Sequence, residues 1–192
     1  MQESYLVFAW GLNVLVVSFV LALFEILLEK NNGWASKLNP CGWGKKVLEG
    51  NIVSRICEKP FLTVYHIFIF LIVVPSALAA EYLAVKWSGI GTSVYLGALG
   101  RPRSCLVMQV GNARVMPLLY AASVWFGIVF VEDFLWFRMN WHYPKSMQDL
   151  LSGKIWWHTQ WITLGSIKLP RFYISSFLAA MALLFASSYW SI

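Results

Sequence analysis

Two adjacent carboxyl groups, those of Glu132 and Asp133, interrupt an apolar run, "IVFVEDFLWF", that otherwise has the composition of a membrane span. An acid at the centre of a bilayer costs about 2.5 to 3.5 kcal/mol on insertion scales, so such groups usually face the bundle interior and pair there. Carboxyl groups in that setting bind metal ions or carry protons. This pair therefore marks a candidate functional site.

The two acids need not serve the same neighbour, because adjacent residues point about 100° apart on a helix. Asp133 is expected to face the interior, on a stripe with Trp136, Phe137 and Asn140. On this pattern Asn140 would either hydrogen-bond the group that Asp133 binds or bind to Asp133 itself. Glu132 is then either a second ligand or the partner of an arginine in a loop.

Further ionisable residues should lie near the same end of the spans. Glu25 and Glu29 are four residues apart and share a helix face, and His66 lies inside a second apolar run. His142 and His158 follow the third run. Beside Lys30, the Glu29 carboxylate is expected to be a solvated helix end, and His142, near Pro144, a plain interfacial histidine. The predicted metal ligands are Glu25, His66, Glu132, Asp133 and His158.

Two kinds of chemistry fit this set of side chains. Oxygen and nitrogen ligands from facing helices can hold one or two transition-metal ions such as iron, manganese or zinc, although the Glu-x-x-His spacing of di-iron bundles is absent. Alternatively, Asp133, His158 and Glu132 would be catalytic groups that move protons on a lipid-like substrate. Sterol-type isomerases of the emopamil-binding class are similar in architecture and in residue type.

A non-enzymatic role is the alternative from another functional class. The chain would then be an accessory or ligand-binding subunit of a membrane complex, its acids paired with basic residues of a membrane-protein partner or of a second copy. A continuous proton path is disfavoured, because the central parts of the third and fourth spans hold no ionisable residue. Whether the protein is an enzyme stays open.

Helices must carry these residues, and a membrane-spanning helix needs about 20 mainly apolar residues. Four stretches qualify, at residues 5–28, 61–80, 117–137 and 172–190. They predict an all-α fold, a polytopic transmembrane bundle of four helices in a single integral membrane domain over residues 1–192. Lys154 to Ile162 is expected to form a short interfacial helix with His158 and Trp161 on one face. The stretch "CLVMQVGNARVM" predicts either a hairpin or an irregular loop.

The composition supports a membrane protein. Of 192 residues, 59% are hydrophobic and 12% are charged, whereas soluble domains carry about 25% charged residues. The net charge of +6 lies in the loops, where anionic lipid is its natural partner, so nucleic acid is not expected. Cys41, Cys57 and Cys105 form no CxxC pair, which disfavours a zinc ribbon or a disulfide framework.

The basic residues also predict an orientation. Loops 29–60 and 138–171 hold six and five Lys or Arg residues, and the loop between the second and third spans holds four. By the positive-inside rule the first two loops are cytoplasmic and both termini lie outside. The candidate residues then gather on the cytoplasmic side, in what we expect to be a prokaryotic cytoplasmic membrane.

Four blocks of the sequence resemble a group of small polytopic membrane proteins from prokaryotes. The blocks are "EILLEKNNGWASKL", "TVYHIFIF", "EDFLWFRMN" and "IWWHTQWI". The likeness covers about three-quarters of the chain and implies that the blocks form one unit, but it implies no activity. The chain departs from the group at Trp141, where the group has proline after the asparagine. The matching positions are Glu25, Glu29, Trp34, His66, Glu132, Asp133, Asn140 and His158.

Overall fold

The computed structural model describes residues 2–31, 33, 46–49, 61–75, 108–110 and 113–189, and these are mostly helical. Three helices are long and apolar enough to cross a membrane. They are α1 (Gln2–Glu29), α5 (Pro117–Met139) and α7 (Arg171–Tyr189). Their bounds agree with three of the four predicted spans to within three residues. The end of the remaining predicted span, residues 76–80, lies outside the described residues.

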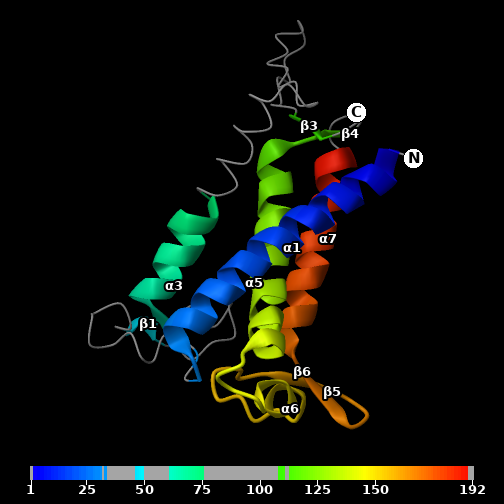
Figure 1. Cartoon of the computed structure of the whole chain (residues 1–192). Helices are drawn as coiled ribbons and strands as arrows, with labels where there is room; N and C mark the ends of the chain where they lie inside the picture. The colour runs from blue at the N-terminus through cyan, green and yellow to red at the C-terminus, as the bar shows by residue number, and fades with distance from the viewer. Residues whose placement is uncertain are drawn as a thin grey trace, which may run out of the picture.

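Helix α5 is the centre of the bundle. It packs against α1 on one side and runs antiparallel to α7 on the other (Figure 1). Pro117 occupies the first turn of α5, where a missing N–H removes no helical hydrogen bond. The Met116 amide donates to the Ser187 carbonyl at 2.9 Å, which joins the start of α5 to the end of α7.

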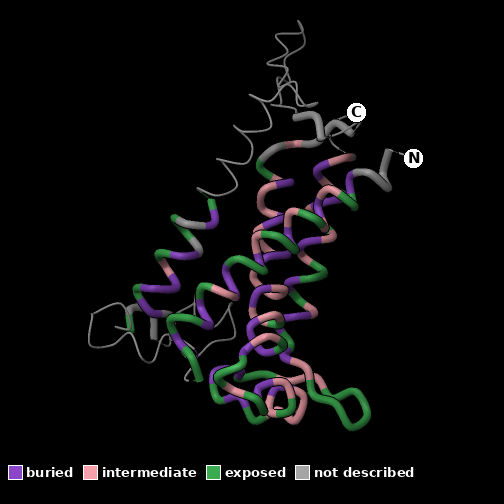
Figure 2. The backbone as a smooth tube through the Cα atoms, in the orientation of Figure 1, coloured by how far each residue is buried: buried purple, intermediate pink, exposed green. Residues whose placement is uncertain are grey.

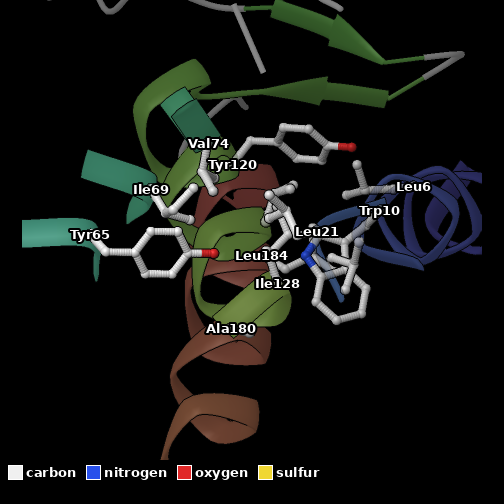
Figure 3. Packing of buried hydrophobic residues seen from close by; sticks show 12 residues of the cluster. Leu6, Trp10, Leu21, Tyr65, Ile69, Val74, Tyr120, Ile128, Ala180 and Leu184 are labelled. Atoms are coloured by element: carbon white, nitrogen blue, oxygen red, sulfur yellow. The ribbon is translucent and has the colours of Figure 1, made fainter. Parts of the chain in front are cut away.

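A core of apolar side chains fills the upper and middle part of the bundle. It combines residues of α1, α5 and α7 with Tyr65, Ile69 and Val74 from the segment that begins with α3 (Figure 3). Small residues allow close approach between helices. A methyl group added at Gly127 would lie 2.7 Å from a methyl carbon of Val14 and 2.9 Å from the Trp10 ring.

Large apolar side chains also cover the outside of the helices. On α1 the exposed ones recur along its whole length, and the same pattern appears on α7 (Figure 2). In a soluble protein such a surface would be a liability, whereas lipid tails are a suitable neighbour for it. The surfaces of α1 and α7 thus suit a membrane, in addition to the length and composition that all three long helices share.

The second predicted span begins differently from expectation. Phe61–Thr63 forms strand β2, which pairs antiparallel with β1 (Lys46–Glu49), and the helix α3 (Val64–Phe68) begins only afterwards. Thr63 is the N-cap, and its hydroxyl accepts a hydrogen bond from the His66 amide at 3.4 Å. The helix continues as a π-helical segment, η2 (Ile69–Val73).

Between α5 and α7 the chain forms a compact end piece. It comprises the short helix α6 (Ser146–Leu151) and a hairpin of β5 (Trp161–Leu164) and β6 (Ile167–Pro170). The predicted interfacial helix over Lys154 to Ile162 is therefore wrong. The stretch is turn and irregular chain that enters β5, because the strand pairs with β6 around a turn at Gly165, whose φ is +62°.

The stretch before α5 is a hairpin, the first of the two alternatives. Strands β3 (Met108–Val110) and β4 (Ala113–Val115) pair antiparallel, with Val110 opposite Ala113. The hairpin lies at the opposite end of the bundle from α6 (Figure 1).

The close approach at Gly127 makes a testable prediction. Gly127→Ala should lower the free energy of unfolding by about 1 to 3 kcal/mol, because the added methyl overlaps Val14 and Trp10. The matched control is Gly11→Ala, where no atom lies within 4 Å of the added methyl. Circular dichroism during titration with denaturing detergent measures both variants. Equal free energies of unfolding for the two variants would contradict the close contact of Gly127 with Val14 and Trp10.

Candidate functional site

The candidate site lies where the C-terminal ends of α1 and α5 meet the start of α7. Its acids are carried by α1 and α5, and its hydroxyl and imidazole groups come from α3, α7 and the end piece. Two groups of polar side chains form on different sides of α5. One is the carboxyl pair of Glu25 and Glu132 with the Tyr65 hydroxyl, and the other is Asp133 with His158 and Tyr173.

The carboxyl pair is buried between α1 and α5. Glu132 is 4% exposed and Glu25 is 9% exposed. The Tyr65 hydroxyl donates to Glu25 Oε1 at 3.0 Å, and the Glu25 and Glu132 side chains are within hydrogen-bonding reach of each other. Glu29, one turn further along α1, is only 2% exposed. The prediction that Glu29 is a solvated helix end is therefore wrong.

A hydrogen bond between two carboxyl groups requires a proton on one of them, because a carboxylate only accepts. Like charges at this distance also cannot both be ionised without a large cost in a buried place. The hydrogen-bonded Glu25–Glu132 pair therefore holds one proton between its two carboxyl groups. The Tyr65 hydroxyl adds a third oxygen to the same hydrogen-bonded chain.

Asp133 contacts α7 and the end piece. Its Oδ2 accepts a hydrogen bond from the Tyr173 hydroxyl at 2.6 Å and lies 3.3 Å from His158 Nε2. The Asp133 side chain is 14% exposed and that of His158 is 1% exposed. The His158 contact joins the end piece to α5, and the Tyr173 hydrogen bond joins α7 to α5.

Aromatic rings enclose the His158 imidazole. It stacks on Phe172 with ring centres 5.2 Å apart and meets Trp161 edge-on at 5.5 Å. The Trp161 indole also donates to the His158 carbonyl at 3.0 Å. The rings of Phe137, Trp157 and Tyr173 lie within 6.1 Å. The geometry holds the imidazole in one orientation, toward Asp133.

The two adjacent acids therefore diverge, as helical geometry predicts. Glu132 is the more deeply buried and faces an acid on α1, whereas Asp133 faces α7. Asn140 does not join Asp133. Its amide donates to the Lys30 carbonyl at 2.6 Å and its oxygen accepts from the His142 amide at 3.0 Å. Asn140 thus caps the end of α1, where Lys30 has a positive φ of 56°.

The two other histidines take different positions. His66 is buried, with Nδ1 2.6 Å from the Thr63 hydroxyl and its ring edge-on to Tyr65. His142 is exposed, and its ring lies beside that of Trp141.

The predicted metal site does not form as a cluster. Among the described residues, which include all five predicted ligands, no group of three or more His, Cys, Asp or Glu side chains is arranged to hold a metal ion. The reason is the divergence on α5, which sends Glu132 toward α1 and Asp133 toward α7 and His158.

Sequence reasoning missed the two tyrosines that complete the groups. Tyr65 directly precedes His66, and Tyr173 lies 40 residues beyond Asp133, so no helical spacing links either to its acid. One general signal was available, since a buried tyrosine hydroxyl usually finds a hydrogen-bond acceptor. Which acid it reaches depends on how the helices rotate, and periodicity alone does not show that.

Comparison of the chain with known protein families, with curated proteins and with solved structures gives no match. The function of the chain therefore has to be inferred from the chemistry of these two groups.

The shared proton gives a spectroscopic prediction. In reconstituted protein at neutral pH, infrared spectra should contain the carbonyl stretch of a protonated carboxyl group, and Glu132→Gln and Glu25→Gln should each remove it. Asp149→Asn is the control, since Asp149 accepts from the Tyr143 hydroxyl in the end piece. A band that persists in both glutamine variants would contradict the shared proton.

The Asp133 group gives a stability prediction. Tyr173→Phe should cost about 1.5 to 3 kcal/mol of unfolding free energy, as expected for a hydrogen bond to a charged acceptor. Ser175→Ala is the control on the same helix, because the Ser175 hydroxyl bonds only within α7, to the Phe172 carbonyl. In the background of Asp133→Asn the effect of Tyr173→Phe should shrink. If the losses of unfolding free energy in the two single variants simply add up in the double variant, the Asp133–Tyr173 contact contributes nothing to stability.

Proposed function

We propose that this protein is a membrane-embedded acid–base enzyme that acts on a lipid-like substrate, with the Glu25–Glu132 pair as its proton donor and acceptor. The observation that supports it is a pair of hydrogen-bonded carboxyl groups buried between two membrane-spanning helices. A purely structural ion pair would join an acid to a base. Two acids that share a proton can give it to a substrate and take it back.

The surroundings suit such a reaction. The pair lies between apolar helices, and hydrogen bonds and charges act strongly where water is scarce. Tyr65 fixes the Glu25 carboxyl, so that Glu132 is the group left to face a substrate. The reaction class is one in which a proton is added at one carbon and removed at another, which needs no oxidant.

Asp133 and His158 have a supporting role in this proposal. Asp133 points about 100° away from Glu132 around α5, toward His158. Aromatic rings enclose His158. The contact between Asp133 and His158 joins the end piece to α5, and in this proposal the end piece serves to keep water from the carboxyl pair. On the positive-inside count the site faces the cytoplasm.

The alternative is a non-enzymatic accessory or ligand-binding subunit of a membrane complex, whose acids pair with basic residues of a partner protein. Stable co-purification with another membrane protein, lost in Glu132→Gln, would favour this alternative.

Proton exchange with a lipid carbon can be measured without knowing the substrate. Protein reconstituted with a total lipid extract from its host and incubated in D2O should place deuterium on carbon in one lipid species, detected by mass spectrometry. Glu132→Gln should lower the rate by about a hundredfold or more, the usual contribution of a general acid or base. Asp149→Asn should keep the wild-type rate. Absence of deuterium incorporation by the wild type would overturn the proposal.

A further inference from the structure

The hairpin of β5 and β6 has two faces of different character. Successive residues of a strand point to opposite faces, and residues that pair across an antiparallel ladder share a face. The register therefore gives the hairpin one apolar face, which consists of Ile162, Leu164, Ile167 and Leu169. The other face carries Trp161, Thr163, Lys168 and Pro170.

The second of these faces packs against the rest of the end piece. A methyl group added at Gly153 would lie 2.6 Å from Cδ of Lys168 and 3.6 Å from Cδ2 of Trp161. Trp161 also packs against the core cluster that contains Ile155, and Pro170 is buried. The hairpin is thus held with its apolar face turned away from the end piece.

The apolar face is open, above all at the tip of the hairpin. Leu164 is 56% exposed and Ile167 is 44% exposed, and these two residues flank the turn (Figure 2). Ile162 and Leu169 are half-buried, and neither core cluster of the described chain includes any of the four residues. A contiguous apolar surface of this kind marks a site of interaction with another apolar body.

The position of the hairpin suggests the membrane as that body. Strand β6 ends at Pro170, and the candidate span α7 begins at the next residue, Arg171 (Figure 1). Arg171 donates twice to Gln160, from its amide at 3.0 Å and from its guanidinium at 2.7 Å, which closes the base of the hairpin. A strand of this length reaches about 13 Å at about 3.3 Å per residue, so the tip lies no farther than that from the membrane surface.

The charges of the same segment match a lipid surface. Lys154, Lys168 and Arg171 are exposed, and the sequence from residue 150 to residue 171 contains no Asp or Glu. Lysine and arginine beside a membrane span attract anionic headgroups. A second copy of the chain is a poorer partner, because none of the acids whose burial the structure describes is exposed.

We propose that the apolar face of the hairpin lies in the interface of a bilayer that contains anionic lipid, with Leu164 and Ile167 among the acyl chains and the basic residues among the headgroups. This face continues the lipid-facing surface of α7, on which Phe177 and Leu178 are exposed. The hairpin attaches the end piece to the membrane surface. The inference goes beyond the proposed function and does not depend on it.

Cysteine alkylation tests this placement in the full chain. Leu164→Cys and Ile167→Cys are placed in lipid nanodiscs of phosphatidylcholine and phosphatidylglycerol, which leave both membrane surfaces open to solution. A charged maleimide reacts only with a thiolate that reaches water. Trypsin releases residues 155–168 as one peptide without a native cysteine, so mass spectrometry measures this site alone.

The matched control is Thr163→Cys, at an exposed position on the other face of the hairpin. Each rate is divided by that of the same variant after unfolding. Alkylation of Leu164→Cys and Ile167→Cys should be slower than that of the control by about tenfold or more, the effect of keeping a side chain in an apolar phase. Equal rates at the three positions would overturn the proposal.

Photolabelling of the wild-type chain identifies what covers the face and needs no substitution. A phosphatidylglycerol with a diazirine in its acyl chain should attach to Leu164 or Ile167 on illumination. Slow alkylation without any lipid adduct would mean that protein covers the face, and would overturn the proposal. In nanodiscs of phosphatidylcholine alone the protection from alkylation should decrease. Equal protection in the two kinds of nanodisc would overturn the assignment to anionic lipid.

Discussion

A carboxyl group buried among membrane-spanning helices must find its hydrogen bonds on a neighbouring element, and this constraint organises the whole structure. Helix α5 carries two such groups in succession, and the 100° step between them sends each to a different neighbour. Glu132 ties α5 to α1 through Glu25, and Asp133 ties it to α7 through Tyr173. The rotation of α5 about its axis is thus fixed by Glu132 and Asp133, the two residues whose burial costs the most free energy.

The end piece between α5 and α7 depends on the same anchoring. Ser146 donates to the Phe137 carbonyl at 2.7 Å, and Asn140 reaches across to the last turn of α1. Within the piece, the Tyr143 hydroxyl donates to Asp149, and burial together with this bond raises the pKa of Tyr143 to about 12. The phenol therefore stays protonated at physiological pH and the bond persists. The first two of these contacts join the end piece to the end of α5 and α5 to the end of α1.

Much of this could be read from the sequence, because it depends on local rules. The lengths of α1, α5 and α7 follow from apolar runs of span length, and Pro117 marks the start of α5. The burial of Glu132 and His158 follows from the cost of polar groups in hydrocarbon. The sequence does not show that these residues belong to two separate groups, because that depends on how each helix is rotated about its axis.

The errors have a common physical origin in long-range contacts. Lys154 to Ile162 has the composition of an interfacial helix, but pairing of Trp161–Leu164 with Ile167–Pro170 makes its end a strand. Glu29 stands beside a lysine at a helix end, yet it is covered in the folded chain.

One oxygen atom, Oδ2 of Asp133, holds together two residues that lie far apart in the sequence. Asp133 Oδ2 contacts both His158 and Tyr173, so the chain from residue 158 to residue 173, hairpin included, begins and ends at a single acceptor. Replacement of Asp133 by alanine would remove both contacts at once. The segment would then be held closed by the pairing of β5 with β6 and by the hydrogen bonds between Arg171 and Gln160.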